Sequence, residues 1–257
     1  MTLARWYEEH GRHDLPWRLT RDRWAILVSE VMLHQTQVPR VAAVYDAFLA
    51  RFPTPGAMAA AGPGAVIEAW GRLGYPRRAR RLYDASVMIA ASGWPEDLAQ
   101  LPGIGRYTAA AVLAQADDCD VPAVEVNVRR VVERVVGRPL GERAAEQASR
   151  RVGRPLHGRD RLLALMDVGA LLCKPRVPRC AECPLRRRCS TRGALPDERR
   201  SRQPAFAGSF RQRRGEVMAR LRVGAAPVVE LDPEALASLV DDGLAVVARG
   251  RARLPAH

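Results

Sequence analysis

The sequence predicts an all-α main body over residues 1–190, followed by a small module of mixed structure. Apolar residues recur at helical spacing through most of this body, and almost no segment in it alternates as a strand would. Clusters of glycine and proline separate the periodic segments. Four closely spaced cysteines follow the last of these segments.

Breakers and caps define the expected helices. Phe52–Pro55, Gly62–Gly64 and Gly74–Pro76 interrupt the apolar pattern. Asp22 or Arg23 can open a helix, and so can Thr54 before Pro55. We expect helices over residues 25–38, 41–50, 65–70, 78–91, 107–116, 126–136, 143–151 and 161–172.

The carboxyl end differs in pattern from the main body. Residues 191–207 are polar without apolar periodicity, which indicates a linker. Beyond it, residues 211–223 and 233–241 are expected helices, and residues 243–247 and 251–254 a hairpin around Arg249-Gly250. Helix, helix, hairpin is the order of a winged-helix module over residues 208–257; a loosely packed tail is the alternative.

The charge of the chain points to a polyanionic partner. Its 257 residues carry a net charge of +13, and the sequence pI is about 10.7. Each phosphate that such a protein neutralises releases counterions, so nucleic acid is a favoured partner, although arginine-rich composition can also reflect genome bias. No apolar signal core or membrane-spanning stretch is found, and we expect a cytoplasmic, nucleoid-associated bacterial protein without membrane contact.

Cys173, Cys180, Cys183 and Cys189 form the pattern C-x6-C-x2-C-x5-C among many arginines. Four soft ligands at such spacing indicate one metal centre, because thiolates bind both structural zinc and iron–sulfur clusters. The residues alone leave both metals open.

Leu101–Thr108 reads LPGIGRYT, with Gly103 and Gly105 before an alanine-rich helix. Glycines at this place permit a tight turn and leave amide N–H groups exposed at a helix N-terminus, where a phosphate oxygen can bind. A lone G-x-G is often only a turn. The flanking helices and the basic charge favour a helix-hairpin-helix that binds the DNA backbone.

Two carboxylates are candidates for catalysis. Glu30 lies in an apolar segment, where a buried carboxyl would have a raised pKa and could deliver a proton. Periodicity alone favours the simpler interpretation, a solvent-facing glutamate. Glu125 precedes Val126 and Asn127 at the expected start of a helix, so it is either a helix cap or an anion that stabilises developing positive charge.

Four motifs together resemble one family. Val28–Val38 (VSEVMLHQTQV), Leu101–Thr108, Val124–Arg130 (VEVNVRR) and the cysteine pattern occur in the order found in the helix-hairpin-helix DNA glycosylases that carry an iron–sulfur cluster. The first motif resembles the adenine DNA glycosylases more than endonuclease III. The similarity covers residues 5–190, and the carboxyl end resembles the short forms of actinobacterial members.

The resemblance implies a fold of two α-helical subdomains and a target base flipped out of the DNA stack. The expected subdomains are a six-helix barrel over residues 22–130, with the helix-hairpin-helix at 98–116, and a cluster subdomain formed by the amino-terminal segment and residues 131–190. By the same resemblance the cysteines bind a 4Fe–4S cluster in preference to zinc.

Roles for single residues are implied by the same resemblance. Glu30 is the general acid, Asn127 supports the oxocarbenium-like transition state, and Tyr107 replaces the lysine of the lyase branch. The remaining implied residues contact DNA or the flipped base: Trp17, Arg18, His34, Gln35, Tyr75, Gly103, Gly105 and Arg106.

Two positions depart from the family pattern. Glu125 stands where the family has a catalytic aspartate, and a carboxylate displaced by about 1 Å can lower a rate on the order of 100-fold. His34 stands where the adenine branch usually has glutamine. The chain also has no room for the larger carboxyl domain that reads 8-oxoguanine in many adenine glycosylases.

The chemistry of the residues adds one exclusion. A lyase needs an amine to form a Schiff base with the sugar, and the only lysine, Lys174, lies inside the cysteine cluster. We therefore predict a monofunctional enzyme, with the terminal amine as the one alternative nucleophile.

The predicted function is a monomeric base excision repair enzyme that hydrolyses the glycosidic bond of adenine opposite 8-oxoguanine or guanine in double-stranded DNA. Alternatives are a glycosylase for thymine or uracil opposite guanine, and a mismatch binder that Glu125 has weakened catalytically.

Overall fold

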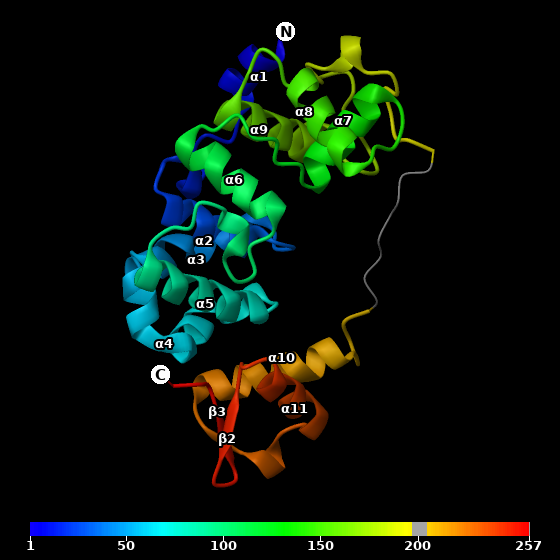
Figure 1. The fold of residues 1–257 in the computed structure, drawn as a ribbon. Helices are drawn as coiled ribbons and strands as arrows, with labels where there is room; N and C mark the ends of the chain where they lie inside the picture. The colour runs from blue at the N-terminus through cyan, green and yellow to red at the C-terminus, as the bar shows by residue number, and fades with distance from the viewer. Residues whose placement is uncertain (197–204, 257) are drawn as a thin grey trace. The chain divides into compact units, whose positions relative to one another are not determined.

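The computed structural model describes residues 1–196 and 205–256 (Figure 1). Contacts within the chain divide it into two compact units, which are described separately. The first unit joins Met1–Glu30 with Ile104–Arg200, and the second joins Val31–Gly103 with Ser201–His257. Within the described ranges, no helix has both the length and the apolarity required to cross a membrane.

The first unit is a helical bundle. Its helices pack around one apolar core that includes Trp6, Val131 and Leu163. Most of its helices lie where the sequence predicts them, but α1 and η1 were not expected. The elements are α1 (Leu3–His10), η1 (Pro16–Arg18), the start of α2 (Arg23–Leu33), α6 (Arg106–Asp117), α7 (Val126–Val136), α8 (Glu142–Val152), α9 (Gly158–Asp167), a π-helical turn (Val168–Leu172) and η5 (Arg186–Arg188).

The second unit contains a helical barrel part and the carboxyl-terminal module. The barrel part consists of α3 (Val38–Arg51), α4 (Pro55–Trp70), η2 (Gly71–Leu73), α5 (Arg77–Ser92) and η3 (Leu98–Gln100). Thr54 caps α4 as predicted, because its hydroxyl accepts a hydrogen bond from the amide of Ala57 at 3.1 Å. Gly62, with a φ of 81°, kinks α4 where the sequence predicts a complete break.

The predicted helix over residues 25–38 is too long. Helix α2 ends at Leu33, and a turn that includes Gln35, with a φ of 56°, separates it from α3. The VSEVMLHQTQV segment contains no glycine or proline that would indicate the end of a helix at Leu33. The contacts that end the helix come from a distant arginine, described below.

The carboxyl-terminal module has winged-helix topology. Helices α10 (Phe210–Val223) and α11 (Pro233–Asp241) and the hairpin β2 (Val246–Ala248)–β3 (Arg251–Arg253) confirm the predicted order. The structure adds strand β1 (Ala226–Pro227), too short to show a period, which completes an antiparallel sheet of order β1-β3-β2. A 3-10 turn, η6 (Val228–Glu230), lies between β1 and α11.

This module packs on the barrel part of its own unit. Arg77 of α5 forms an ion pair with Asp242, and Arg80 donates to the carbonyl oxygen of Gly243 at 2.9 Å. A Cβ atom at Gly64 would overlap the carbonyl oxygen of Pro255. These contacts attach the module to α4 and α5, so it is not a loosely packed tail. Part of the predicted linker, residues 197–204, lies outside the described residues, and the predicted subdomain boundaries stay predictions.

Candidate active site and cysteine pocket

Glu30 is buried at the centre of a small polar network. Its side chain belongs to α2 and is 4% exposed. The hydroxyl of Tyr107 donates to its Oε2 at 3.0 Å, and Nε2 of Gln115 donates to its Oε1 at 2.7 Å. The interpretation of Glu30 as a solvent-facing glutamate is therefore wrong.

The environment of Glu30 favours its protonated form. Burial raises the pKa of its carboxyl above the ordinary range, and the hydrogen bonds from Gln115 and Tyr107 offset this only in part. The charge of Glu125 raises the same pKa further, while that of Arg18 lowers it. A carboxyl of this kind keeps its proton to higher pH than an exposed one and can deliver it to a bound group.

Helix α6 presents both donors to Glu30. Gly105 is its N-cap, and Tyr107 and Gln115 lie two turns apart on it. Burial raises the pKa of the Tyr107 hydroxyl well above its ordinary value, and Glu30 and Glu125 add to this effect, so the phenol stays a neutral donor. The guanidinium of Arg159 donates to the main-chain oxygen of Gln115 and holds this end of the helix.

Glu125 is the N-cap of α7. Its Oε2 accepts from the amide of Asn127 at 2.7 Å and its Oε1 accepts from the amide of Val128 at 2.9 Å. This confirms the capping interpretation, and the positive end of the helix dipole accounts for the place of the anion. Burial nevertheless raises the pKa of Glu125, although these hydrogen bonds lower it.

Asn127 connects Glu125 to a buried arginine. Its Nδ2 donates to Oε2 of Glu125 at 3.0 Å, and its Oδ1 accepts from Arg130 at 2.7 Å. Arg130 also donates to the main-chain oxygens of Gly169 and Cys173. The carboxylate of Glu125 thus accepts hydrogen bonds from several fixed donors. These donors are placed for the side chain of glutamate, which is one methylene longer than that of aspartate.

The amino-terminal segment places Trp17 and Arg18 in the interior of the first unit. Trp17 is 3% exposed. Both terminal nitrogens of Arg18 donate to Asp167, at 2.6 and 2.9 Å, and Arg12 pairs with the same carboxylate. Burial raises the pKa of Asp167, but the two arginines outweigh it and keep the group ionised.

In the second unit, Arg78 joins the two loops that carry Gln35 and Tyr75, which the family resemblance implies are wedge residues that enter the DNA stack. Its NH1 donates to the main-chain oxygens of Val31, Met32 and His34 at 2.6 to 2.9 Å, which caps the end of α2. Its NH2 donates to Thr36 Oγ1 and to the main-chain oxygens of Leu73 and Gly74. The same guanidinium lies over the rings of Trp70 and Tyr75, at 5.2 and 5.4 Å from their centroids.

The wedge candidates lie on strained turns in these two loops. Gln35 is exposed and Tyr75 is 40% exposed, and their φ angles are 56° and 49°. His34 is partly buried beside Arg78; burial lowers the pKa of its imidazole, and the charge of Arg78 lowers it further. Arg78 therefore fixes the shape of the two turns that carry Gln35 and Tyr75.

The glycine turn has the expected local form. Gly103 has a φ of 76°, and a Cβ atom there would meet the side chain of Arg81 at 2.6 Å. Gly105 precedes the first residue of α6, Arg106, whose side chain is 71% exposed and lies 3.3 Å from Glu146. Gly105 thus caps α6 without a side-chain hydrogen bond, as phosphate binding at a helix N-terminus requires.

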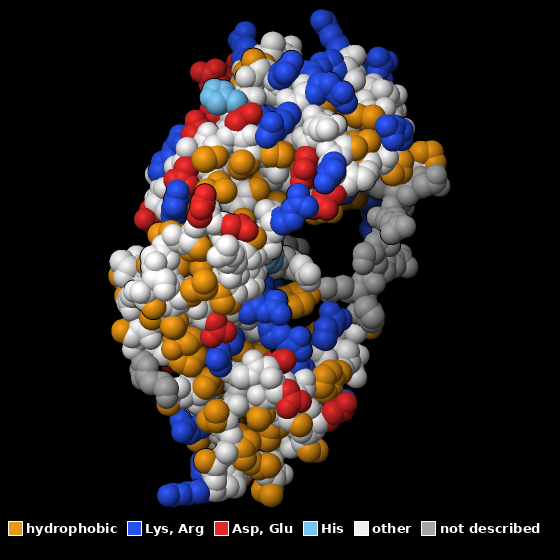
Figure 2. All heavy atoms as spheres, in the orientation of Figure 1, with side chains coloured by type: hydrophobic (Ala, Val, Ile, Leu, Met, Phe, Trp, Pro, Cys, Tyr) orange, Lys and Arg blue, Asp and Glu red, His pale blue; other side chains and the backbone are white. Residues whose placement is uncertain are grey.

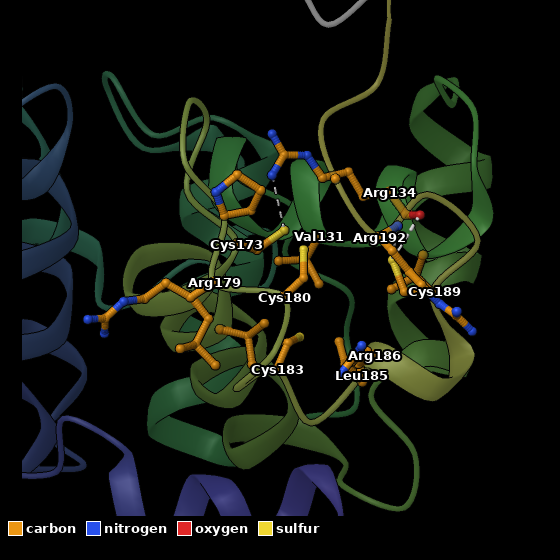
Figure 3. A pocket seen from close by; sticks show the side chains of 15 residues that line it. Val131, Arg134, Cys173, Arg179, Cys180, Cys183, Leu185, Arg186, Cys189 and Arg192 are labelled. Carbon is orange, nitrogen blue, oxygen red and sulfur yellow. Dashed lines mark hydrogen bonds between the residues drawn. The ribbon is translucent and has the colours of Figure 1, made fainter.

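The four cysteines line one open pocket of the first unit. Figure 3 shows their side chains around it, with Val131, Leu185 and several arginines. Among the described residues, no three cysteine, histidine or carboxylate side chains lie close enough together to share one ion. Four thiol donors around one pocket fit a metal centre held by cysteine.

Arg134 is the main support of this pocket. It is 1% exposed, and its NH1 lies 3.5 Å from Sγ of Cys173. It also donates to the main-chain oxygens of Lys174 and Pro175. The amide of Arg192 donates to Sγ of Cys189 at 3.4 Å. Such donors stabilise charge on cysteine sulfur.

Sequence reasoning missed three supporting residues. Gln115, Arg78 and Asp167 are buried or partly buried and hold the site through long-range contacts. Gln115 gave a usable signal, because it is the one amide in the alanine-rich segment Thr108–Ala116. Arg78 and Asp167 gave none, since charged residues are common in both of their helices.

Comparison with known proteins gives consistent matches. Residues 28–155 match the HhH-GPD superfamily of base excision DNA repair proteins. The adenine DNA glycosylase of Mycolicibacterium smegmatis is 42% identical over 94% of this chain and 90% of its own length. The thymine-DNA glycosylase of Aeropyrum pernix is 35% identical over 73% of this chain and 91% of its own length. A solved structure of a thermostable thymine-DNA glycosylase superposes with a TM-score of 0.68 at 27% identity, over 74% of this chain and 93% of that one.

Proposed function

Because this chain belongs to the adenine DNA glycosylase family of the HhH-GPD superfamily, we propose that it removes adenine from A:8-oxoguanine and A:G pairs by hydrolysis. One observation carries the proposal. Glu30 is a buried carboxyl with a raised pKa, and two neutral donors hold it. Such a group suits proton delivery to a leaving base and does not suit a purely structural role.

Glu30 begins the reaction as a general acid. Its proton passes to a ring nitrogen of the flipped adenine, and the C1′–N9 bond breaks with its electron pair leaving on the base. Tyr107 and Gln115 fix the carboxyl by one hydrogen bond to each oxygen. The resulting carboxylate can then accept a proton from the attacking water.

Glu125 stabilises the positive charge that develops on the sugar. Both of its oxygens are fixed by the first turn of α7, so the anion needs no rearrangement when charge develops. Asn127 holds Glu125 from a second direction. The two carboxylates thus have different tasks: one gives a proton and the other stays charged.

We also propose that base removal proceeds without strand cleavage. The position on α6 that faces Glu30 carries Tyr107, which cannot form a Schiff base. Lys174 lies in the cysteine loop, where its main-chain oxygen accepts a hydrogen bond from the buried Arg134.

In this proposal the enzyme acts as a monomer on duplex DNA, and Gln35 and Tyr75 enter the base stack.

The cysteine pocket would hold a 4Fe–4S cluster through Cys173, Cys180, Cys183 and Cys189. Its four thiol donors, together with the family to which the chain belongs, support this assignment over a single zinc ion. With every ligand position filled by cysteine, the cluster would supply structural order to the loop 173–189 and leave hydrolysis to the carboxylates. A visible absorbance band near about 400 nm in the purified protein would test the assignment.

A second candidate substrate is thymine opposite guanine. Thymine-DNA glycosylases are among the relatives of this chain, at 35% identity in one case. Tyr107 and the glutamate at position 125 are both compatible with it. The adenine DNA glycosylases of Mycolicibacterium smegmatis and Mycobacterium tuberculosis cover more of the chain and are more similar, which favours adenine.

One assay separates these candidates. Duplexes with A:8-oxoguanine, A:G, T:G and U:G pairs are incubated with protein and analysed with and without hot alkali. We expect cleavage of the adenine strand only, and only after alkali. Cleavage at T:G or U:G would replace the substrate assignment, cleavage without alkali would refute the monofunctional assignment, and tight binding without cleavage would leave a mismatch binder.

A further inference from the structure

The β2–β3 hairpin of the carboxyl-terminal module carries an isolated group of positive charges. Arg249, Arg251 and Arg253 lie on it, and all three are exposed. Residues 243–256 contain no acidic side chain. Figure 2 shows basic side chains projecting from the end of this module, where the hairpin of Figure 1 lies.

Three of the six acidic side chains of residues 208–257 pair with arginines outside the hairpin. Asp232 and Glu234 pair with Arg213 of α10, at 2.9 and 2.7 Å. Asp242 pairs with Arg214 of α10 and Arg77 of α5. These ion pairs hold the module together and attach it to α5, and they leave the hairpin cationic.

In a typical winged helix the recognition helix makes the main DNA contacts, whereas here the charges favour the hairpin. Helix α11 occupies the position of a recognition helix, yet it begins after Asp232 and carries Glu234 and Asp241. Its acidic side chains would repel DNA phosphates. The hairpin, which is the wing of such a module, carries three exposed arginines and no acidic side chain.

The tip of the hairpin has a strained arginine. Arg249 and Gly250 have φ angles of 51° and 69°, as a type I′ turn requires at its two central residues. Asparagine, aspartate or glycine adopts the first of these positions more easily than arginine does. An arginine retained in this conformation indicates a use for its charge at the tip.

The strand that follows presents its cations on one side. Arg251 and Arg253 flank Ala252, which is fully buried, so both side chains point away from the module. Residues two apart on a strand are about 6.8 Å apart, close to the separation of successive phosphates on one DNA strand. Arg251 also donates to the main-chain oxygen of Ala225 at 2.8 Å, which holds it in place.

We propose that this hairpin is a second duplex-binding surface, which grips the DNA backbone through Arg249, Arg251 and Arg253. The inference rests on the proposed function in so far as the protein must act on duplex DNA. Because the module is attached to α4 and α5, its contacts would add to those of the barrel part without a contribution from α11.

The test uses the full chain and a duplex of about 30 base pairs with a central A:G pair, titrated from about 50 to 200 mM salt. The variant is the double substitution Arg249→Gln/Arg253→Gln, and the control is Arg5→Gln/Arg220→Gln, which removes the same charge from two exposed helix positions. Each lost phosphate contact should lower the salt slope by about 0.9 and the affinity about fivefold near 0.15 M salt.

We therefore expect the variant to bind about 25-fold more weakly, with a salt slope shallower by about 1.8, while the single-turnover rate at saturating enzyme is unchanged. An unchanged slope and affinity in the variant, or an equal loss in the control, would overturn the inference. A wild-type protein that does not bind the duplex would instead refute the proposed function, and this inference with it.

A second variant separates binding from folding. Arg249→Gly relieves the strained turn and removes the charge, so it should raise the melting temperature while weakening duplex binding about fivefold. A more stable variant with unchanged affinity would show that the arginine at the tip does not contact DNA.

Discussion

Glu30→Gln should abolish base removal without weakening the protein. The change keeps the shape of the side chain but removes the proton that the carboxyl delivers and the base that it later becomes. Glu125 cannot take over, because both of its oxygens are bound by the amides that begin α7. Each lost proton-transfer role lowers a rate by about 10²–10⁴-fold, so we expect a loss on the order of 10⁴-fold, or about 5.5 kcal/mol of transition-state stabilisation.

Glu30→Gln should raise the stability of the protein although it lowers the rate of base removal. The pKa of Glu30 is raised in the folded protein because of burial, so the folded state holds its proton more tightly than the unfolded chain does. The stability associated with this group is present below the unfolded pKa and is lost as pH rises through the folded value. As pH rises above the unfolded pKa, wild type loses this stability and the variant, which does not titrate, does not lose it, so the melting temperature of the variant relative to wild type should be higher at pH 8 than at pH 4.

The measurement is a single-turnover excision assay on an A:G duplex, together with thermal melts at both pH values. Glu8→Gln is the matched control, since Glu8 is an exposed glutamate of α1 and should change neither quantity. A variant rate within tenfold of wild type would refute the acid assignment. A lower melting temperature at pH 8 would refute the account of the pKa.

Four further predictions concern the supporting residues. Glu125→Gln should lower the excision rate at least 100-fold. It should also move the high-pH limb of the rate profile to lower pH, because the charge of Glu125 helps to raise the pKa of Glu30. Glu125→Asp should lower the rate on the order of tenfold, since the donors around Glu125 are placed for the longer side chain. Tyr107→Phe should move the same limb to higher pH, because the lost hydrogen bond lowers the pKa of Glu30 in wild type. Arg78→Met should lower the free energy of unfolding by about 3 kcal/mol in denaturant titrations and weaken mismatch binding, with Arg78→Lys recovering only part of both. Cys183→Ala should remove the visible absorbance and lower the melting temperature, whereas Cys119→Ala should leave the spectrum intact.

Local patterns in the sequence predicted most of the helices. Helices α5 to α9 lie within a few residues of their predicted ranges because apolar periodicity and caps are properties of short segments. The same reasoning found α10, α11 and the hairpin. Strand β1 was missed because two residues cannot show a period. The end of α2 was missed because the side chain that caps it, Arg78, lies 44 to 47 residues later in the chain.

The candidate site also depends on contacts between residues far apart in the chain, which local sequence patterns do not predict. Periodicity misjudged Glu30, since the two groups that make its burial tolerable lie 77 and 85 residues away. Only the resemblance to a known family placed this glutamate in a site. By contrast, the capping role of Glu125 was visible locally, because its partners are the next few amides of its own helix.

The departure at Glu125 therefore has less force than the sequence suggested. The amides of Asn127 and Val128 fix its carboxylate, and the first turn of a helix binds either acidic side chain. The longer side chain changes the position of the Glu125 carboxylate relative to Glu30. The charge of Glu125 acts on Glu30, because it raises the pKa of the Glu30 carboxyl. Burial raises the pKa of both carboxyls, but only Glu125 accepts main-chain amide hydrogen bonds that lower it, so in the proposed mechanism Glu30 carries the proton and Glu125 the charge. Two glutamates in one site can in this way take the opposite roles that hydrolysis of a glycosidic bond needs.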